Sequence, residues 1–568
     1  MKLLKKVNIR QILLILILLL ATFLRFWNLS DVPPSASLDE ASIGYNAYSV
    51  LKTGVDEYGD FPIISQRGYD DWRRSTYLFL TIPFIKLFGL NVVSVRLPAV
   101  ILSVLSVWAT YHIILLLFSK QTKFSANAAL IGALMLAISP WHIYISRLGH
   151  ESNACLAFLI FGVLFFLQGL KNNNANKIFL SLLLFVLSMI SYYSGQVFIP
   201  LFILGLIFIF RKNLLSIILS SKKNLILLSA LIVLSVVILA AVFSPEALMR
   251  YRGTSTFDPE AHPKEFAKRV ELRNQAIKDN NLIGILLYNR RIFYVQVFIE
   301  GYVSHFNPKW LFTNFSSAHK VPNTGLLYLW EIPFILLGIF VLILSKIIDV
   351  RIKKTIFLWF LLAPLPAAIA AQVPHAMRSY NFLPIWQIFT AFGITYLLYV
   401  LRKYNKIFLY LLTLLIIITL AAFYKNYFFI FSKTQSSSFQ YSLSKVIPFV
   451  AKNQTKYKKV IISNHDNLLQ SYMFYLFYTR YDPKIYLEKG GTISGGYAQT
   501  HELDNLFFMP FDPRGIKDQK NILYVGNPDD FLIKTFVREK LVRIVKLHTS
   551  AVFKDLDGKT SVEIISKK

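Results

Sequence analysis

Two adjacent carboxylates, Asp39 and Glu40, stand at the start of a segment with a helical pattern. Ser37 or Asp39 can cap this helix, and Gly54 can end it. Apolar and polar residues separate onto two sides, with Ile43, Ala47, Val50 and Leu51 on one side and Ser42, Asn46, Ser49 and Lys52 on the other. The pattern predicts an amphipathic helix. Its carboxylates can take a proton as a general base, or they can simply complement the positive end of the helix dipole.

Other ionisable residues could complete such a site: Arg73, Arg74, Arg147, Glu151, His375 and Arg378. An arginine can bridge two oxygens of a phosphate, whereas a lysine offers a point charge. Glu151 can orient a substrate, or it can form a structural salt bridge with Arg147. His142, His150 and Glu151 fit no compact zinc spacing, so we expect no required metal or other cofactor.

The composition determines which elements must position these residues. Of 568 residues, 55% are hydrophobic and only 16% are charged, and the mean hydropathy is +0.49. This composition excludes a soluble enzyme. The single cysteine, Cys155, excludes an internal disulfide and a cysteine-based metal site.

Eleven apolar stretches are long enough to be membrane-spanning helices. They lie near 11–29, 92–118, 125–140, 153–170, 177–193, 196–210, 224–244, 324–345, 355–372, 380–401 and 406–424. Every second short loop is basic, for example at Lys120, Lys123, Lys222, Lys223, Arg402 and Lys403, and Asp349 is the only acid in these loops. The positive-inside rule therefore predicts a cytoplasmic N-terminus. These loops and the N-terminus account for about half of the net charge of +30, so we expect no nucleic-acid partner.

Three segments are then predicted on the outer side of the membrane: residues 30–75, residues 245–323 and the tail from 430. The first is acidic, and we expect its helix to lie in the membrane interface. The second contains Arg290, Arg291, His305, His319 and Lys320, and its length suits a loop folded over an active site. The tail has strand-like runs at 459–463 and 521–525 and a helical stretch at 468–478. We predict a transmembrane domain at 1–429 and a soluble extracytoplasmic α/β domain at 430–568.

The position of the ionisable residues distinguishes two kinds of membrane protein. Coupled transporters place charges near the membrane midplane. The predicted spans contain almost no such residues, and Arg96 and Glu331 both lie within about two turns of the outer surface. This layout favours an enzyme that acts at the bilayer surface on a lipid-linked substrate.

Several short motifs carry a resemblance to a known family. They are Arg25–Leu29, Pro33-Pro34, Asp39–Ala41, Gly44–Ala47, Gly54, Phe88-Gly89, Val95–Pro98, Ser139–His142, Ser146-Arg147, His150-Glu151, Leu327–Pro333 and Pro374–Arg378. With them, most of residues 20–400 resembles the GT-C membrane glycosyltransferases. The pattern is most similar to the protein O-mannosyltransferase and aminoarabinose transferase superfamily. Within it, the pattern resembles the bacterial proteins that are similar to dolichyl-phosphate-mannose-protein mannosyltransferases. The tail carries no motif of comparable specificity.

The resemblance implies a GT-C fold in a prokaryotic cell membrane and a polyprenyl-phosphate-linked sugar, such as mannose or another hexose, as donor. The sugar would pass to an acceptor hydroxyl on a protein, lipid or glycan. Since polyprenyl phosphate leaves as a weakly basic anion, one carboxylate and cations on the phosphate suffice, and direct displacement predicts inversion.

The motifs assign these roles to residues of this chain. Asp39 matches the acid in the first outer loop and is the expected base, with Glu40 as the fallback, and Glu151 matches a second acid. Arg378 and His375 are expected near the donor phosphate, while Arg73, Arg74 and Arg147 are candidates for contacts to donor or acceptor. Residues 73–74 depart from the Lys-Pro-Pro pattern of some relatives.

Two alternatives stay open. An oligosaccharide-transferring GT-C relative would need a larger cleft and a divalent metal. A transporter or flippase of lipid-linked sugars would need a polar path through the bundle.

Overall fold

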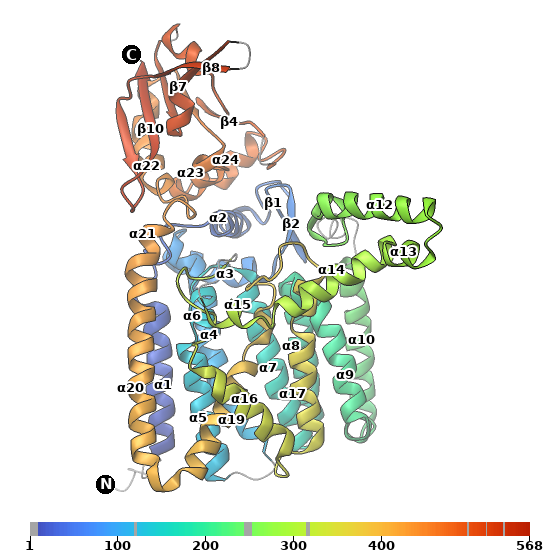
Figure 1. Cartoon of the computed structure of the whole chain (residues 1–568). Helices are drawn as coiled ribbons and strands as arrows, with labels where there is room; N and C mark the ends of the chain where they lie inside the picture. Colours follow the sequence, from blue (N-terminus) through green and yellow to red (C-terminus); the bar gives the residue numbers. More distant parts are fainter. Residues whose placement is uncertain are drawn as a thin grey trace, which may run out of the picture. The chain divides into compact units, whose positions relative to one another are not determined.

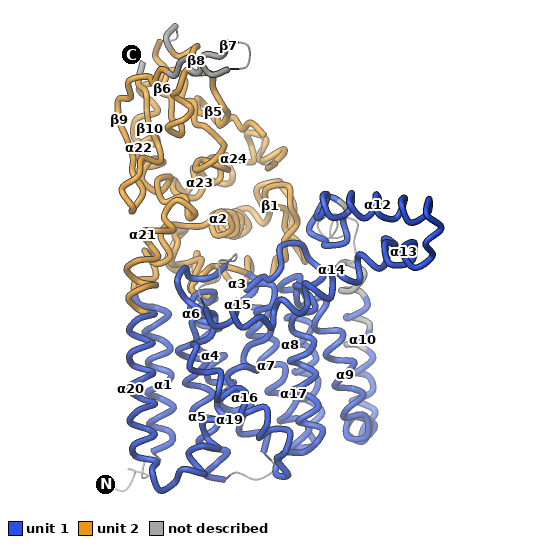
Figure 2. The backbone as a smooth tube through the Cα atoms, in the orientation of Figure 1, with its two compact units in different colours: residues 1–27, 100–146, 151–423 blue, residues 28–99, 147–150, 424–568 orange. Residues whose placement is uncertain are grey.

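A helix lies in each of the eleven segments predicted as spans (Figure 1). The computed structural model describes residues 9–118, 122–242, 253–313, 319–496, 499–518, 520–537 and 540–567. Lys120 and parts of the predicted outer segment 245–323 lie outside the described residues. The described chain divides into two compact units: residues 1–27, 100–146 and 151–423 in the first, and residues 28–99, 147–150 and 424–568 in the second (Figure 2).

Within its described residues, the first unit consists of helices and their connections, with one isolated β-bridge between Ser255 and Ala370. Its helices are α1 (Ile9–Phe26), the larger part of α4 (Val92–Leu116), α5 (Lys123–Ile138), α6 (Pro140–Ser146), α7 (Glu151–Lys171), α8 (Ala175–Ser191), α9 (Tyr193–Ile218), α10 (Lys222–Val242), α12 (Pro263–Lys278), α13 (Leu282–Leu287), α14 (Arg290–Ser304), α15 (Pro308–Phe312), α16 (Glu331–Leu344), α17 (Val350–Leu362), α18 (Leu365–Ala368), α19 (Ile385–Val400) and α20 (Asn405–Tyr424).

Six stretches of helix in the described chain are long and apolar enough to cross a membrane. They are Ile9–Phe26, Val92–Leu116, Glu151–Lys171, Tyr193–Ile218, Tyr380–Val400 and Arg402–Thr434. The pair α5 and α6, bent by 54°, brings the number to seven if it forms one span. The chain is therefore built as a polytopic helical membrane protein, and the total of eleven spans stays a prediction.

The bend between α5 and α6 lies beside a buried cation that the sequence reasoning missed. Ser139 precedes Pro140 and adopts extended backbone, as expected before proline. Arg25 of α1 donates through Nη1 to the carbonyl of Ala137 at 2.9 Å, and its Nη2 lies 2.6 Å from Nδ1 of His142. Arg25 is a further ionisable residue within a predicted span, and it is fully buried in α1.

Helices α16 and α19 pack with their backbones in close approach at two glycines. A Cβ on Gly338 would lie 1.8 Å from the carbonyl oxygen of Phe389, and one on Gly393 would lie 2.0 Å from that of Phe334. Small residues of this kind allow membrane helices to pack tightly.

The second unit combines helices and strands. They are α2 (Leu38–Thr53), β1 (Ser65–Gly68), β2 (Asp71–Arg74), α3 (Thr76–Phe88), α21 (Ser432–Thr434), α22 (Leu443–Asn453), β3 (Lys459–Ile462), α23 (Ser471–Thr479), α24 (Pro483–Glu488), β4 (His501–Leu503), β5 (Leu506–Phe508), β6 (Ile522–Gly526), β7 (Leu532–Val537), β8 (Lys540–Lys546), β9 (Ala551–Lys554) and β10 (Thr560–Lys567).

The tail is organised around a six-stranded sheet with the strand order β4-β5-β3-β6-β10-β9. Strand β3 runs parallel to β5 and β6, whereas β4, β10 and β9 pair in antiparallel fashion. Strands β3 and β6 and helix α23 lie where the sequence pattern predicts them. The domain boundary at residue 430 and the side of the membrane on which the tail lies stay predictions.

The amphipathic interpretation of residues 37–54 was wrong. The helix starts and ends as predicted, with Ser37 as N-cap and Gly54 in the left-handed region at a φ of 84°. However, Ser42, Asn46 and Ser49 on the supposedly polar side are buried. Helix α2 contacts α3, α23 and α24, so its polar side faces protein.

Candidate active site

The start of α2 presents its two carboxylates differently. Ser37 and Glu40 form a capping box, in which the Ser37 amide donates to Glu40 Oε2 at 2.9 Å and the Glu40 amide donates to Ser37 Oγ at 3.3 Å. This reciprocal pair turns Glu40 back onto the chain. Asp39 takes no part in the box, and its side chain is 42% exposed.

Asp39 is held by a cation from the β1–β2 hairpin. Arg73 Nη2 lies 2.6 Å from Asp39 Oδ1, and the Arg73 side chain is only 9% exposed. The guanidinium also stacks over Tyr69, whose hydroxyl donates to the carbonyl of Leu38 at 2.8 Å. His150 approaches the other oxygen, with 3.9 Å between its Nε2 and Asp39 Oδ2. The hairpin and His150 therefore fix a partly exposed carboxylate at a helix N-terminus, where the dipole stabilises its charge.

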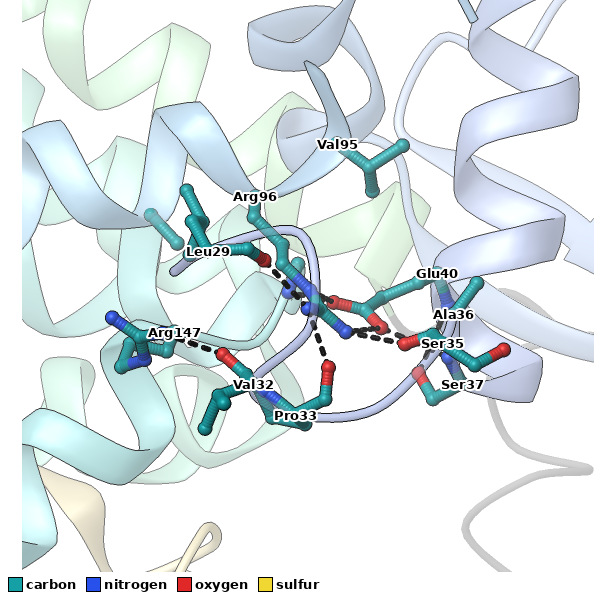
Figure 3. A network of polar contacts seen from close by, with 12 residues as sticks. Leu29, Val32, Pro33, Ser35, Ala36, Ser37, Glu40, Val95, Arg96 and Arg147 are labelled. Carbon is teal, nitrogen blue, oxygen red and sulfur yellow. Dashed lines mark hydrogen bonds and ion pairs between the residues drawn. The ribbon is translucent and has the colours of Figure 1, made fainter. Parts of the chain in front are cut away.

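Glu40 forms a buried ion pair with Arg96 (Figure 3). Arg96 Nε lies 2.7 Å from Glu40 Oε1, and Nη2 lies 3.0 Å from Oε2. The amide of Gly149 donates to Oε1 at 2.8 Å. Burial acts to raise the pKa of Glu40, but the charge and hydrogen bonds of Arg96 outweigh burial, and the pKa lies below its usual value. The carboxylate is thus charged and closed off from an acceptor, which argues against Glu40 as a base.

Arg96 also organises the chain that leads into α2. Its Nη1 donates to the carbonyls of Leu29 and Pro33, both at 2.9 Å, and its Nη2 donates to that of Ser35 at 2.6 Å (Figure 3). A salt bridge that satisfies three further backbone oxygens fixes this loop in one conformation.

Arg74 and Arg147 are buried in similar structural surroundings. Arg74 donates through Nη1 to Ser65 Oγ at 2.7 Å. Arg147 donates through Nη2 to the carbonyls of Asn28 and Val32 at 3.1 and 2.6 Å, and its guanidinium lies 4.8 Å from the centre of the Phe428 ring. These contacts favour structural roles instead of the predicted contacts with donor or acceptor: Arg74 holds the β1–β2 hairpin, and Arg147 holds the loop before α2.

The remaining predicted residues belong to the first unit. Glu151 starts α7 and is buried. His375 and Arg378 lie together, since the Arg378 amide approaches His375 Nδ1 at 3.3 Å, and Arg378 Nη1 donates to the carbonyl of Ala371. His305 Nε2 accepts the amide of His375 at 3.2 Å, and the rings of His319 and His375 are 4.9 Å apart.

This histidine cluster was not foreseen, although its three members were noted separately in the sequence. Burial lowers the pKa of His305 to about 4, so this ring is neutral at pH 7. Within the described residues, no three His, Cys, Asp or Glu side chains are arranged to hold a metal ion.

A second buried carboxylate follows α2 and was also missed. Glu57 Oε1 accepts a hydrogen bond from Asn46 at 3.0 Å, and Oε2 accepts from the hydroxyls of Thr492 at 2.7 Å and Tyr472 at 3.3 Å. Burial raises the pKa of Glu57 to about 7. Residues of the tail therefore hold the loop that follows the Asp39 helix.

Comparison with known proteins supports the resemblance seen in the sequence. Residues 76–239 match the family model of dolichyl-phosphate-mannose-protein mannosyltransferases. No curated protein matches the chain.

Solved structures share the fold. The oligosaccharyltransferase AglB of Archaeoglobus fulgidus, in complex with an inhibitory peptide and a dolichol-phosphate, is 13% identical, with a TM-score of 0.50 over 92% of this chain and 70% of that chain. The apo form of the Archaeoglobus fulgidus enzyme is 12% identical, with a TM-score of 0.51 over 94% and 71%. ArnT from Cupriavidus metallidurans, bound to undecaprenyl phosphate, is 11% identical, with a TM-score of 0.50 over 97% of each chain. The family match and the shared fold together confirm the resemblance of this membrane protein to GT-C glycosyltransferases.

Proposed function

We propose that this protein is a membrane glycosyltransferase that moves a hexose, such as mannose, from a polyprenyl-phosphate donor to an acceptor hydroxyl. Asp39 takes the proton of the acceptor hydroxyl as its oxygen forms a bond to the anomeric carbon. The bond from that carbon to the phosphate oxygen breaks, and polyprenyl phosphate leaves with the electron pair. A single displacement inverts the anomeric configuration.

The observation that carries this proposal is the contrast between two neighbouring acids. Asp39 is 42% exposed, whereas Glu40 is 1% exposed and bonded through both oxygens. A base must come within hydrogen-bonding distance of the proton that it takes. Only the first of these two carboxylates is accessible to an acceptor.

The other predicted residues have distinct parts in the proposed reaction. Arg73 and His150 position Asp39, with Arg73 at its Oδ1 and His150 near its Oδ2. We assign the donor phosphate to Arg378, with His375 beside it, because a guanidinium can bridge two phosphate oxygens. Glu151 would orient the acceptor. Glu40 and Arg147 hold the loop before α2, and Arg74 holds the β1–β2 hairpin.

The relatives support the class of donor. Structures that share this fold contain dolichol-phosphate or undecaprenyl phosphate. We propose that the site faces the outer side of a prokaryotic membrane, with the N-terminus cytoplasmic and the tail extracytoplasmic. The acceptor hydroxyl belongs to a protein, a lipid or a glycan.

A transfer assay tests this function. The purified protein in lipid nanodiscs would receive undecaprenyl-phosphate-linked mannose, radiolabelled in the sugar, together with a detergent extract of bacterial envelopes as acceptor. We expect label to appear in the acceptor and unlabelled undecaprenyl phosphate to be released. Asp39→Asn should reduce the rate by about 100-fold or more, while Asp60→Asn, an exposed acid of the same loop, should retain the parental rate.

Two results would contradict the proposal. An unchanged rate in Asp39→Asn would remove Asp39 as the base. In sealed vesicles, movement of the intact labelled donor between leaflets without cleavage would instead identify a flippase.

A further inference from the structure

An apolar groove of about 630 Å³ lies between α8, α9 and α10. These helices contact one another within the first unit (Figure 1). It is lined by Leu182 and Met189 of α8, Leu204 of α9, and Ile232 and Val236 of α10. Its volume is in the range of sites that bind small ligands.

The groove exposes large apolar side chains of α9 and α10. Leu204 is 63% exposed, Ile232 is 54% exposed and Val236 is 59% exposed. Helix α9 contains Pro200 and leaves helical geometry at Phe210, so its two halves border the groove at an angle. A concave apolar surface between predicted spans fits a hydrocarbon chain.

A cation lies in the same groove. Arg211 follows the kink in α9, lines the groove and is exposed, and its guanidinium rests over the Phe208 ring at 5.4 Å. Lys212, Lys222 and Lys223 lie close to it in the chain, and residues 205–242 contain no acid. Within the described residues no carboxylate pairs with these four cations. The groove therefore combines an apolar surface with the positive charge of Arg211, which has no carboxylate partner among the described residues.

We propose that this groove binds an anionic glycerophospholipid, with an acyl chain between α8, α9 and α10 and the phosphate at Arg211. Basic residues at a membrane surface attract anionic lipids, and a guanidinium forms charge-assisted hydrogen bonds to phosphate. The sequence predicts residues 211–223 on the cytoplasmic side, opposite the side proposed for the donor phosphate. The occupant is therefore a lipid of the inner leaflet, and the inference does not depend on the glycosyltransferase proposal.

Native mass spectrometry of the full chain tests this site. The protein would be released from nanodiscs that contain phosphatidylglycerol or phosphatidylcholine, and bound lipid would be counted. We expect the parent to retain phosphatidylglycerol in preference to phosphatidylcholine. Arg211→Gln should weaken this retention by about tenfold, the loss of one charge-assisted contact, whereas Arg211→Lys should restore part of it.

Matched variants distinguish the contribution of the lipid headgroup from that of the acyl chain. Arg402→Gln removes an exposed arginine outside the groove on the same predicted side and should leave retention unchanged. Ile232→Trp fills the groove and should remove bound lipid without altering the thermal unfolding of the protein. Equal retention of both lipids by the parent, or unchanged retention in Arg211→Gln, would overturn the proposal. Displacement of phosphatidylglycerol by equimolar undecaprenyl phosphate would show that the groove prefers a polyprenyl lipid and would also overturn it.

Discussion

Two buried carboxylates lie at opposite ends of helix α2, in different surroundings. Glu40, in the first turn, faces the guanidinium of Arg96. Glu57, after the helix, receives hydrogen bonds from Asn46, Thr492 and Tyr472, which are all neutral. The pKa of Glu40 is lowered despite its burial, whereas the pKa of Glu57 is raised to about 7. The Arg96 cation keeps Glu40 charged, whereas burial, with the nearby charge of Asp56, raises the pKa of Glu57.

The largest expected effect on stability comes from removing the buried ion pair between Glu40 and Arg96. Glu40→Gln leaves the Arg96 guanidinium buried beside a neutral amide, and loss of one partner from a buried ion pair costs about 3–5 kcal/mol. We expect a marked fall in the unfolding temperature of the protein in nanodiscs. An unfolding temperature equal to that of the parent would show that the pair contributes little.

Glu57, whose hydrogen-bond donors are neutral, should instead make the free energy of unfolding depend on pH. Because the folded pKa of Glu57 is raised from 4.5 to about 7, the folded protein keeps a proton that the unfolded chain releases. Its stabilising contribution is fully present below pH 4.5 and is lost as the pH rises through 7, which amounts to about 3 kcal/mol. Glu57→Gln should remove this decline and be more stable than the parent at pH 8.

Asp56 provides the control for this measurement. Burial raises its pKa to about 6, so it adds a decline of its own that Glu57→Gln leaves in place. An unfolding free energy that falls equally from pH 4.5 to 8 in the parent and in Glu57→Gln would exclude Glu57 as the titrating group.

A smaller effect is expected from removing one donor to Glu57. Thr492→Val keeps the shape of the side chain but removes the hydroxyl that donates to Glu57 Oε2. Since the lost donor stabilises the ionised form, the variant should be less stable at pH 8 by about 1–2 kcal/mol. Equilibrium unfolding of both proteins at pH 8 measures the difference, and equal stabilities would show that Thr492 does not support the carboxylate.

The smallest effect is expected at the exposed ion pair between Arg67 and Asp70. Both side chains are near 30% exposed, and such pairs contribute about 0–1 kcal/mol. Arg67→Gln should therefore unfold almost as the parent does, in the same experiment as Glu40→Gln. A loss as large as that of Glu40→Gln would mean that burial is not what separates the two pairs.

The sequence predicted elements well because their signals are local. Apolar length located the helices, and the alternating pattern of the tail located β3 and β6. The Ser37-Leu-Asp-Glu40 spacing is itself the signature of a capping box, and it would have shown that Glu40 turns inward while Asp39 does not.

The partners of these residues could not be predicted, because they come from distant parts of the chain. Arg96 lies 56 residues from Glu40, and Thr492 lies 435 residues from Glu57. No local pattern links them. The burial of the polar side of α2 was also missed, because it depends on how the next segment turns back on the helix, where Asn46 bonds to Glu57 and Ser49 donates to the carbonyl of Val55.

The central claim is that Asp39 reacts while Glu40 supports the fold, and paired measurements on Asp39→Asn and Glu40→Gln test it most directly. Transfer rate and unfolding temperature would be recorded on the same nanodisc preparations. We predict that Asp39→Asn loses transfer by about 100-fold or more at nearly the parental unfolding temperature, whereas Glu40→Gln unfolds at a clearly lower temperature and its folded fraction still transfers sugar. Parental transfer by Asp39→Asn, together with an inactive but fully stable Glu40→Gln, would contradict the account.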